Sequence, residues 1–195
     1  TTSSRATQLI ICRPLPMHRY GLLYACAQKN LGPAGVTLVL IRNDLLERAP
    51  DDLHSMLNYR EYSENNSLAN TPPVFACYVV MLVTRWLLEH GGLAKMEERN
   101  RAKAAMLYQV LDEYEDFYQG HAAPECRSTM NVTFRLPSDE LTKRFVNEAA
   151  EKGLRELKGH RSVGGIRASI YNAMPVDGVE KLREFMLEFA AVAKV

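Results

Sequence analysis

The sequence lacks a long apolar run, an excess of either charge and a leader-like N-terminus, and each absence narrows the functions to consider. The longest apolar run, 74–83, is too short to cross a bilayer and leads directly into Thr84 and Arg85. Lysine and arginine total 24 against 23 acidic residues, a net charge of +1, whereas a nucleic-acid-binding surface usually needs a clear basic excess. Residues 1–7 are polar, without the charged-then-apolar order of a signal peptide. We therefore expect a cytoplasmic protein with no nucleic-acid and no membrane partner.

Cysteine and histidine are too scattered to predict a metal site. No cysteines share a C-x-x-C spacing, and the five histidines have no ligand-like spacing to them. We expect no metal, and free, buried thiols in a reducing compartment. The cysteines are Cys12, Cys26, Cys77 and Cys126.

What the chain does contain is an ordinary globular composition. Its 195 residues are 47% hydrophobic and 24% charged, enough to bury a sizeable core in one or two domains. The short apolar runs 22–27 and 36–41 predict strands buried on both faces of an α/β sheet. The polar, glycine-bearing connector 28–35 joins them at a strand end, where α/β proteins tend to place ligands.

The middle of the chain predicts a loop followed by two helices. Residues 50–73 contain strong turn signals, and the spacing after Pro73 predicts an amphipathic helix that ends at Gly91-Gly92. The apolar positions of this helix are Phe75, Tyr78, Val79, Leu82, Trp86 and Leu87. A second helix, from about 93 to 118, is predicted to bury Leu107, Val110, Leu111, Tyr114 and Tyr118. Its charged residues are predicted to form a solvated face of Glu97, Glu98, Arg99, Arg101 and Lys103.

From about residue 120 the pattern predicts an α+β unit. Strands are predicted at 130–136 and 166–171. Ser138 is expected to cap a helix that buries Leu141, Phe145, Val146 and Ala149. The last helix is expected to start near Asp177, paired with Glu180 as in a capping box, and to bury Val179, Leu182, Met186 and Phe189. We place the domain boundary between 1–97 and 98–195.

Lys29 and the Asn70–Pro73 stretch contain residue types that can do chemistry. Lys29 in the connector is either a lysine that forms a Schiff base in a partly desolvated setting or an ordinary loop lysine. Asn70 and Thr71, just before a helix, either bind an oxyanion such as phosphate or simply start the helix.

Residues 159–169 hold a third candidate. His160, Arg161 and Arg167 surround Gly164-Gly165, and arginine binds carboxylate and phosphate groups through its two-pronged guanidinium. The stretch is either a site for a dianionic substrate or a surface turn that leads into a strand.

Together these stretches resemble the phosphoserine aminotransferase family, class-V enzymes of pyridoxal-phosphate fold type I. The resemblance runs in order from about residue 13 to the end and is strongest at 24–35, 70–73, 91–92, 130–131 and 157–173. It implies an α/β fold, the C-terminal half of such an enzyme, in which 1–97 ends the large cofactor-binding domain and 98–195 forms a small α+β domain.

The resemblance also implies roles for individual residues. Lys29 would bind pyridoxal 5'-phosphate as an imine, with Gln28 beside the cofactor phosphate. Asn70 and Thr71 would reach the cofactor of the other subunit of a homodimer. Arg167 resembles the arginine that binds the substrate α-carboxylate, while His160 and Arg161 resemble the residues that bind the distal phosphate or carboxylate. The implied reaction transfers an amino group between glutamate and 3-phosphohydroxypyruvate, in serine biosynthesis.

The chain departs from the family in length and at its start. Family members are about twice as long, and their aspartate that pairs with the pyridine nitrogen has no counterpart, because no acidic residue precedes Asp44. Arg5 stands at the spacing of that aspartate, and Cys26 stands where a glycine is usual. Two further interpretations therefore stay open: a non-catalytic fragment that folds or dimerises without cofactor, and a class-V enzyme with another amino donor or acceptor.

Overall fold

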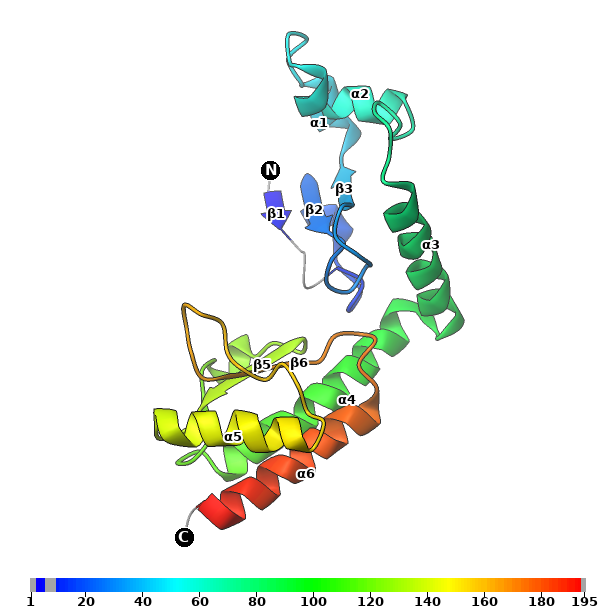
Figure 1. Cartoon of the computed structure of the whole chain (residues 1–195). Helices are drawn as coiled ribbons and strands as arrows, with labels where there is room; N and C mark the ends of the chain where they lie inside the picture. Colours follow the sequence, from blue (N-terminus) through cyan, green and yellow to red (C-terminus); the bar gives the residue numbers. More distant parts are fainter. Residues whose placement is uncertain (1–2, 6–9, 194–195) are drawn as a thin grey trace. The chain divides into compact units, whose positions relative to one another are not determined.

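The computed structural model (Figure 1) describes residues 3–5 and 10–193, and the chain divides into two compact units. These units are Thr1–Lys95 and Met96–Val195, and each is described by itself. The division falls two residues before the expected end of the first domain at residue 97.

The first unit contains a three-stranded sheet in the order β1-β2-β3. β2 (Leu22–Cys26) pairs in parallel with β1 (Ser3–Arg5) and antiparallel with β3 (Thr37–Ile41). The two predicted strands are confirmed, but the predicted burial of both faces is wrong for β3, whose Leu40 is 40% exposed. β3 has no strand beyond it among the described residues, so its apolar side chains are covered only in part.

The prediction of a loop over 50–73 is wrong, because this segment contains α2 (Tyr59–Glu64). The Asn58 side chain caps α2 by accepting a hydrogen bond from the Arg60 amide at 3.0 Å. The Arg60 guanidinium donates to the carbonyls of Leu46 and Ala49, and so ties α2 to the end of α1 (Asn43–Glu47). Short 3₁₀ turns at Met17–Arg19 and Ser55–Leu57 complete the connections.

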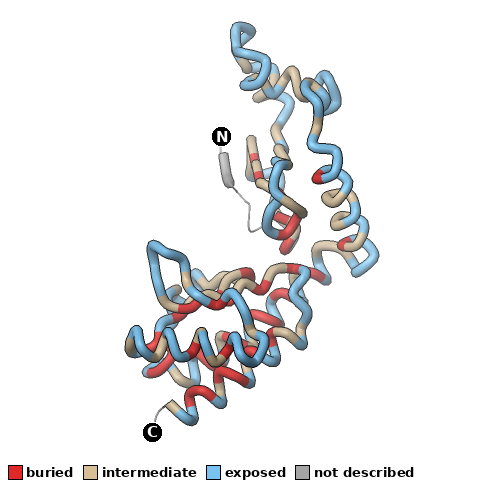
Figure 2. The backbone as a smooth tube through the Cα atoms, in the orientation of Figure 1, coloured by how far each residue is buried: buried red, intermediate tan, exposed pale blue. Residues whose placement is uncertain are grey.

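The helix predicted after Pro73 is confirmed as α3 (Val74–Glu89), but its predicted apolar face is largely wrong. Phe75 and Tyr78 are 75% and 53% exposed, whereas Ala76 and Leu87 are buried and Val80 packs against the small core of β2. Apolar residues occupy both sides of this helix, so their spacing alone does not select the side that packs. Figure 2 shows α3 mostly exposed or intermediate.

The second unit packs helices against the antiparallel sheet β4-β5-β6. The strands are β4 (Gln119–Gly120), β5 (Asn131–Arg135) and β6 (Ile166–Ser169). The helices are α4 (Gly92–Glu113), α5 (Asp139–Glu151) and α6 (Val176–Ala193), with a 3₁₀ turn at Pro124–Cys126. Both predicted strands and all three helices are confirmed, although α4 ends at Glu113, earlier than expected, and α6 begins at Val176, so that Asp177 lies inside its first turn.

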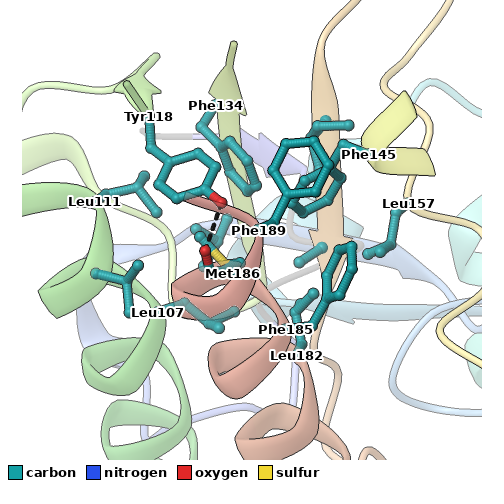
Figure 3. Packing of buried hydrophobic residues seen from close by; sticks show 14 of the residues in the cluster. Leu107, Leu111, Tyr118, Phe134, Phe145, Leu157, Leu182, Phe185, Met186 and Phe189 are labelled. Carbon is teal, nitrogen blue, oxygen red and sulfur yellow. Dashed lines mark hydrogen bonds between the residues drawn. The ribbon is translucent and has the colours of Figure 1, made fainter. Parts of the chain in front are cut away.

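Aromatic rings fill the core of this unit (Figure 3). Phe145 of α5 makes edge-to-face contacts with Phe134 and Phe189 at centroid distances of 5.8 and 5.1 Å. The Tyr118 hydroxyl donates to the Met186 carbonyl at 2.7 Å, so the polar end of this buried ring is satisfied. Ser138 caps α5 as predicted, accepting from the Leu141 amide at 3.1 Å.

Lys103 contradicts the prediction of a uniformly solvated charged face on α4. Its side chain is fully buried, and Nζ donates to the carbonyls of Ile170, Tyr171 and Met174 at 3.1, 2.8 and 3.1 Å. Met96, Asn100 and Leu107 are buried with it, so Lys103 continues the buried stripe of the helix. An ammonium has three donors, and the three carbonyls match them.

The cysteines are free, as predicted, but only Cys12 is buried. Cys26 is intermediate, while Cys77 on α3 and Cys126 in a 3₁₀ turn are exposed, so the prediction of burial is wrong for these two. Within the described ranges, no single helix is long and apolar enough to cross a membrane, and only the bent pair α3 with α4 reaches that length and composition.

Candidate active site

A tight turn after β2 presents Lys29. The Ala27 carbonyl accepts the amides of Lys29 and Gly32 at 2.7 and 2.8 Å, and the Ala27 amide donates to the Val36 carbonyl at 2.9 Å. Leu31 is buried beneath this turn, whereas Gln28 and Lys29 are exposed. The buried strand and Leu31 thus fix the turn, and the two polar side chains extend from it.

Gly32 lets the same turn approach α3 closely. A Cβ at this position would lie 3.1 Å from Val80 Cγ2, tighter than most side-chain contacts. Val80 is the seventh residue of α3, which begins at Val74. The Lys29 turn therefore packs along the helix and away from its N-terminal end.

Asn70 and Thr71 are exposed and lie just before α3. The Asn70 amide donates to the Thr71 carbonyl at 3.1 Å, and no side-chain hydrogen bond caps α3, whose N-cap is Pro73. α3 begins directly after Pro73, as expected if this stretch simply starts the helix, although neither side chain caps it. Their side chains remain available to a ligand at this end of the unit.

The second unit carries a pocket of about 110 Å³ between β5, β6 and the loop 159–165. It brings together His160 and Arg167, two of the three residues predicted here, whereas Arg161 is exposed and is not among the residues that line it. The complete lining is His121, Thr133, Phe134, Arg135, Gly159, His160, Val163, Gly164, Ile166 and Arg167.

Arg167 offers a buried donor to this pocket. Its position in β6 alternates with buried Ile166 and Ala168, so its side chain lies on the sheet face opposite the core, level with Thr133. Arg167 Nε is buried and has no hydrogen-bond partner in the described part of the chain. Because buried donors are nearly always satisfied, this guanidinium is suited to an anion in the pocket.

His160 is oriented by its own loop. The Ser162 amide donates to His160 Nδ1 at 3.3 Å, and the Ser162 hydroxyl lies 2.8 Å from the same nitrogen. A lone pair must therefore be present on Nδ1, which leaves Nε2 to carry the proton of the neutral ring. That N–H is a donor for an oxyanion.

Three polar lining residues were missed in the sequence: His121, Thr133 and Arg135. Thr133 and Arg135 alternate with Val132 and Phe134 along β5, so the strand pattern itself assigns them to the face of Arg167. His121 has no such signal, because it follows β4 in a turn whose position depends on pairing with Thr133.

The model of the class-V aminotransferase family matches residues 5–182, and the chain belongs to that family. Among curated proteins, the chain is similar to the phosphoserine aminotransferase of Rhodopirellula baltica, at 57% identity over 96% of this chain and 50% of that protein. It is similar to the Geobacillus kaustophilus enzyme of the same name at 58% identity, over 92% of this chain and 50% of that protein. The chain therefore spans about half the length of the curated relatives it matches.

Solved structures agree with this assignment. The phosphoserine aminotransferase from Bacillus circulans subsp. alkalophilus superposes with a TM-score of 0.95 at 47% identity, over 98% of this chain and 53% of that chain. A PLP-bound phosphoserine aminotransferase from Trichomonas vaginalis gives 0.88 at 38% identity, over 94% of this chain and 53% of that chain. The predicted family and the mixed helix-and-sheet fold are confirmed.

The residues present suit the aldehyde and the phosphate of pyridoxal phosphate but not its pyridine nitrogen. The exposed Lys29 amine suits its aldehyde, and the exposed Gln28 side chain offers donors to its phosphate, while Asn70 and Thr71 are exposed at the other end of the contact with α3. The pyridine nitrogen needs a carboxylate, but the first acidic residue of the sequence is Asp44, beyond the strands that precede the Lys29 turn. Lys29 and these polar side chains are the groups of this chain that suit such a cofactor.

Proposed function

We propose that this chain is the lysine-bearing part of a phosphoserine aminotransferase, which transfers an amino group between glutamate and 3-phosphohydroxypyruvate and yields 2-oxoglutarate and O-phospho-L-serine. The unpartnered Nε of Arg167, in the same pocket as His160, is the observation that carries the proposal. Both substrates of this reaction are anions with two acidic groups, and the pocket offers a guanidinium and an imidazole to receive them.

Lys29 performs the proton transfer in this proposal. Pyridoxal phosphate, when bound, supplies an electron sink for the pair left when the substrate Cα loses its proton. The Lys29 amine would act as the base that takes this proton and then delivers it to C4′ of the cofactor, as transfer of the amino group requires. Its exposed place on a rigid turn supports this role, since Nζ can reach a ligand while the turn stays fixed by the Ala27 carbonyl.

The pocket of the second unit binds the acidic groups of the substrate. Arg167 receives the α-carboxylate through its two-pronged guanidinium. His160 donates from Nε2, and Arg161, exposed in the same loop, adds a cation for the distal phosphate or carboxylate. Binding of the substrate anion by a few side chains, and not by a broadly basic surface, is consistent with the net charge of +1.

We further propose a cytoplasmic homodimer. Asn70 and Thr71 are exposed at the N-terminal end of α3, and the Lys29 turn contacts that helix at Val80. This separation supports a role for the pair at the cofactor of a second subunit, which also needs donors to its phosphate.

A non-catalytic fragment is the second candidate. The exposed side chains of Phe75, Tyr78 and Leu40 support it, because exposed apolar groups can mark a surface that associates with another polypeptide without any cofactor. In this case the fold and the pocket would persist without cofactor binding.

Titration of the ¹⁵N-labelled chain with O-phospho-L-serine tests the proposed substrate class. We expect amide shifts at Gly164, Gly165 and Arg167, and at least about tenfold weaker binding in Arg167→Met, because a charged hydrogen bond is worth about 1.5–3 kcal/mol. Arg144→Met, which removes an exposed guanidinium paired with Glu148, serves as the control and should bind normally. Equal binding of L-serine and O-phospho-L-serine would contradict the assignment and favour a class-V enzyme with another substrate.

A further inference from the structure

The loop that carries His160 and Arg161 is closed firmly at its base. Lys158 bridges to Ile166, and the Gly159 amide donates to the Gly165 carbonyl at 2.8 Å. The two sides approach so closely that a Cβ on Gly159 would lie 1.9 Å from the Gly164 carbonyl oxygen. The base of the loop therefore has one geometry, set by backbone contacts.

The tip of the loop is held differently. Within it, the amides of Val163 and Gly164 both donate to the His160 carbonyl, at 2.9 and 2.8 Å. In the described chain, one hydrogen bond joins residues 160–164 to a residue outside the loop: Arg135 Nη2 donates to the Val163 carbonyl at 2.9 Å.

The stem of Arg135 also lies along the loop. A Cβ on Gly165 would lie 3.0 Å from Arg135 Cγ and 2.6 Å from the Phe134 carbonyl oxygen, so strand and loop backbone are in close contact there. Arg135 follows Phe134 at the end of β5, and its side chain lines the same pocket as His160 and Arg167.

We propose that Arg135 is a positioning residue for the anion pocket. Its guanidinium holds the Val163 carbonyl, and this contact fixes the tip of the loop so that His160 and Arg161 face an anionic group bound beside Arg167. The identity of that group, a phosphate monoester, rests on the proposed function, whereas the clamp on the loop does not.

Arginine suits this position because its N–H groups point in different directions, so that one guanidinium can serve two partners. One Nη bonds the carbonyl, while the remaining N–H groups and the delocalised charge stay at the pocket, where they add to the field of Arg167. Methionine would retain the apolar stem and lose both effects. Lysine would retain the charge and one donor.

The test measures loop order and anion binding separately. Amide hydrogen exchange and inorganic phosphate titrations are followed by NMR on wild type, Arg135→Met, Arg135→Lys and the control Arg144→Met. We expect Arg135→Met to speed exchange at Val163 and Gly164 about fivefold and to weaken phosphate binding by a similar factor, as the loss of one hydrogen bond predicts. Arg135→Lys should recover most of both, and Arg144→Met should change neither.

The two readouts separate this proposal from the proposed function. Unchanged exchange in Arg135→Met would overturn the clamp, whatever happens to phosphate binding. Recovery of phosphate binding but not of slow exchange in Arg135→Lys would also overturn it, because charge alone would then explain the effect. If wild type shows no phosphate shifts in the pocket while Arg135→Met still exchanges faster, the clamp stands and the proposed anion site fails.

Discussion

Lys103 places an ammonium on the buried side of α4, against the end of β6. Its donors bond the carbonyls of Ile170, Tyr171 and Met174, so three backbone acceptors converge on one buried ammonium. These carbonyls follow Arg167 in the chain by only a few residues, so Lys103 stabilises the segment that leads out of the pocket. Burial of the Lys103 ammonium lowers the free energy of unfolding, because it removes a charge from water.

This cost of burial predicts that the free energy of unfolding depends on pH. Burial, with a smaller effect of Arg99, lowers the pKa of Lys103 to about 8 from its ordinary value of 10.5. Between these values the folded chain binds fewer protons than the unfolded chain, so the contribution of Lys103 to the free energy of unfolding rises with pH from about 8 to 10.5 and is lost as the pH falls through 8. Urea unfolding at several pH values in this range should show a steeper rise for wild type than for Lys103→Met. The exposed Lys143→Met should keep the wild-type slope, and equal slopes for wild type and Lys103→Met would refute the role of Lys103.

Phe145 shows how one side chain joins the elements of the second unit. It projects from α5 and contacts rings of β5 and α6 (Figure 3). Helix spacing and strand alternation place all these rings on inward faces, and their burial removes a large apolar area from water.

Truncation at this position should therefore be severe. We expect Phe145→Ala to lower the free energy of unfolding by about 3–5 kcal/mol, because the side chain is fully buried and a cavity remains. Phe75→Ala on α3 removes the same group from a position that is 75% exposed, and should change the free energy of unfolding by less than about 0.5 kcal/mol. Chemical denaturation of both variants checks the contrast, and similar losses would show that the face of α3 is covered in solution.

The two units also differ in how far their structure could be predicted from sequence. In the second unit each element has one apolar and one polar face, so Phe145, Met186 and the Ser138 cap were predicted correctly. In the first unit α3 is apolar on both sides, and its packing depends on contact with Gly32, which spacing does not encode. The burial of Lys103 was missed for a related reason. Its charge led to the prediction of a solvated side chain, although its spacing places it on the same side of α4 as Met96 and Leu107.

Prediction of the candidate sites had similar limits. Local composition identified Lys29, His160 and Arg167, and the pocket contains the last two. Arg135 and His121 enter that pocket only through strand pairing and the return of a loop over β5, which are non-local. Residue types thus predict the chemistry of a site, while its positioning residues depend on the fold.

The candidate functional residues of the chain lie in both units. Lys29, Asn70 and Thr71 belong to the first unit, and the anion pocket belongs to the second. The sequence spans about half of its relatives, at 50% of the Rhodopirellula baltica protein, and it contains no carboxylate before Asp44 to pair with a pyridine nitrogen. Lys29 and the proposed anion-binding residues are nevertheless present, so the capacity to bind an aldehyde can be tested on this chain directly.

Reduction of the chain with borohydride after mixing with pyridoxal phosphate tests that capacity. If Lys29 is the reactive amine, an absorption band of the imine should form, and peptide mapping should find the reduced adduct on Lys29. Lys29→Arg should abolish that adduct, while Lys158→Arg, at another exposed lysine, should leave it intact. An adduct spread over several lysines, or none on Lys29, would contradict the assignment of this chain as the lysine-bearing part of an aminotransferase.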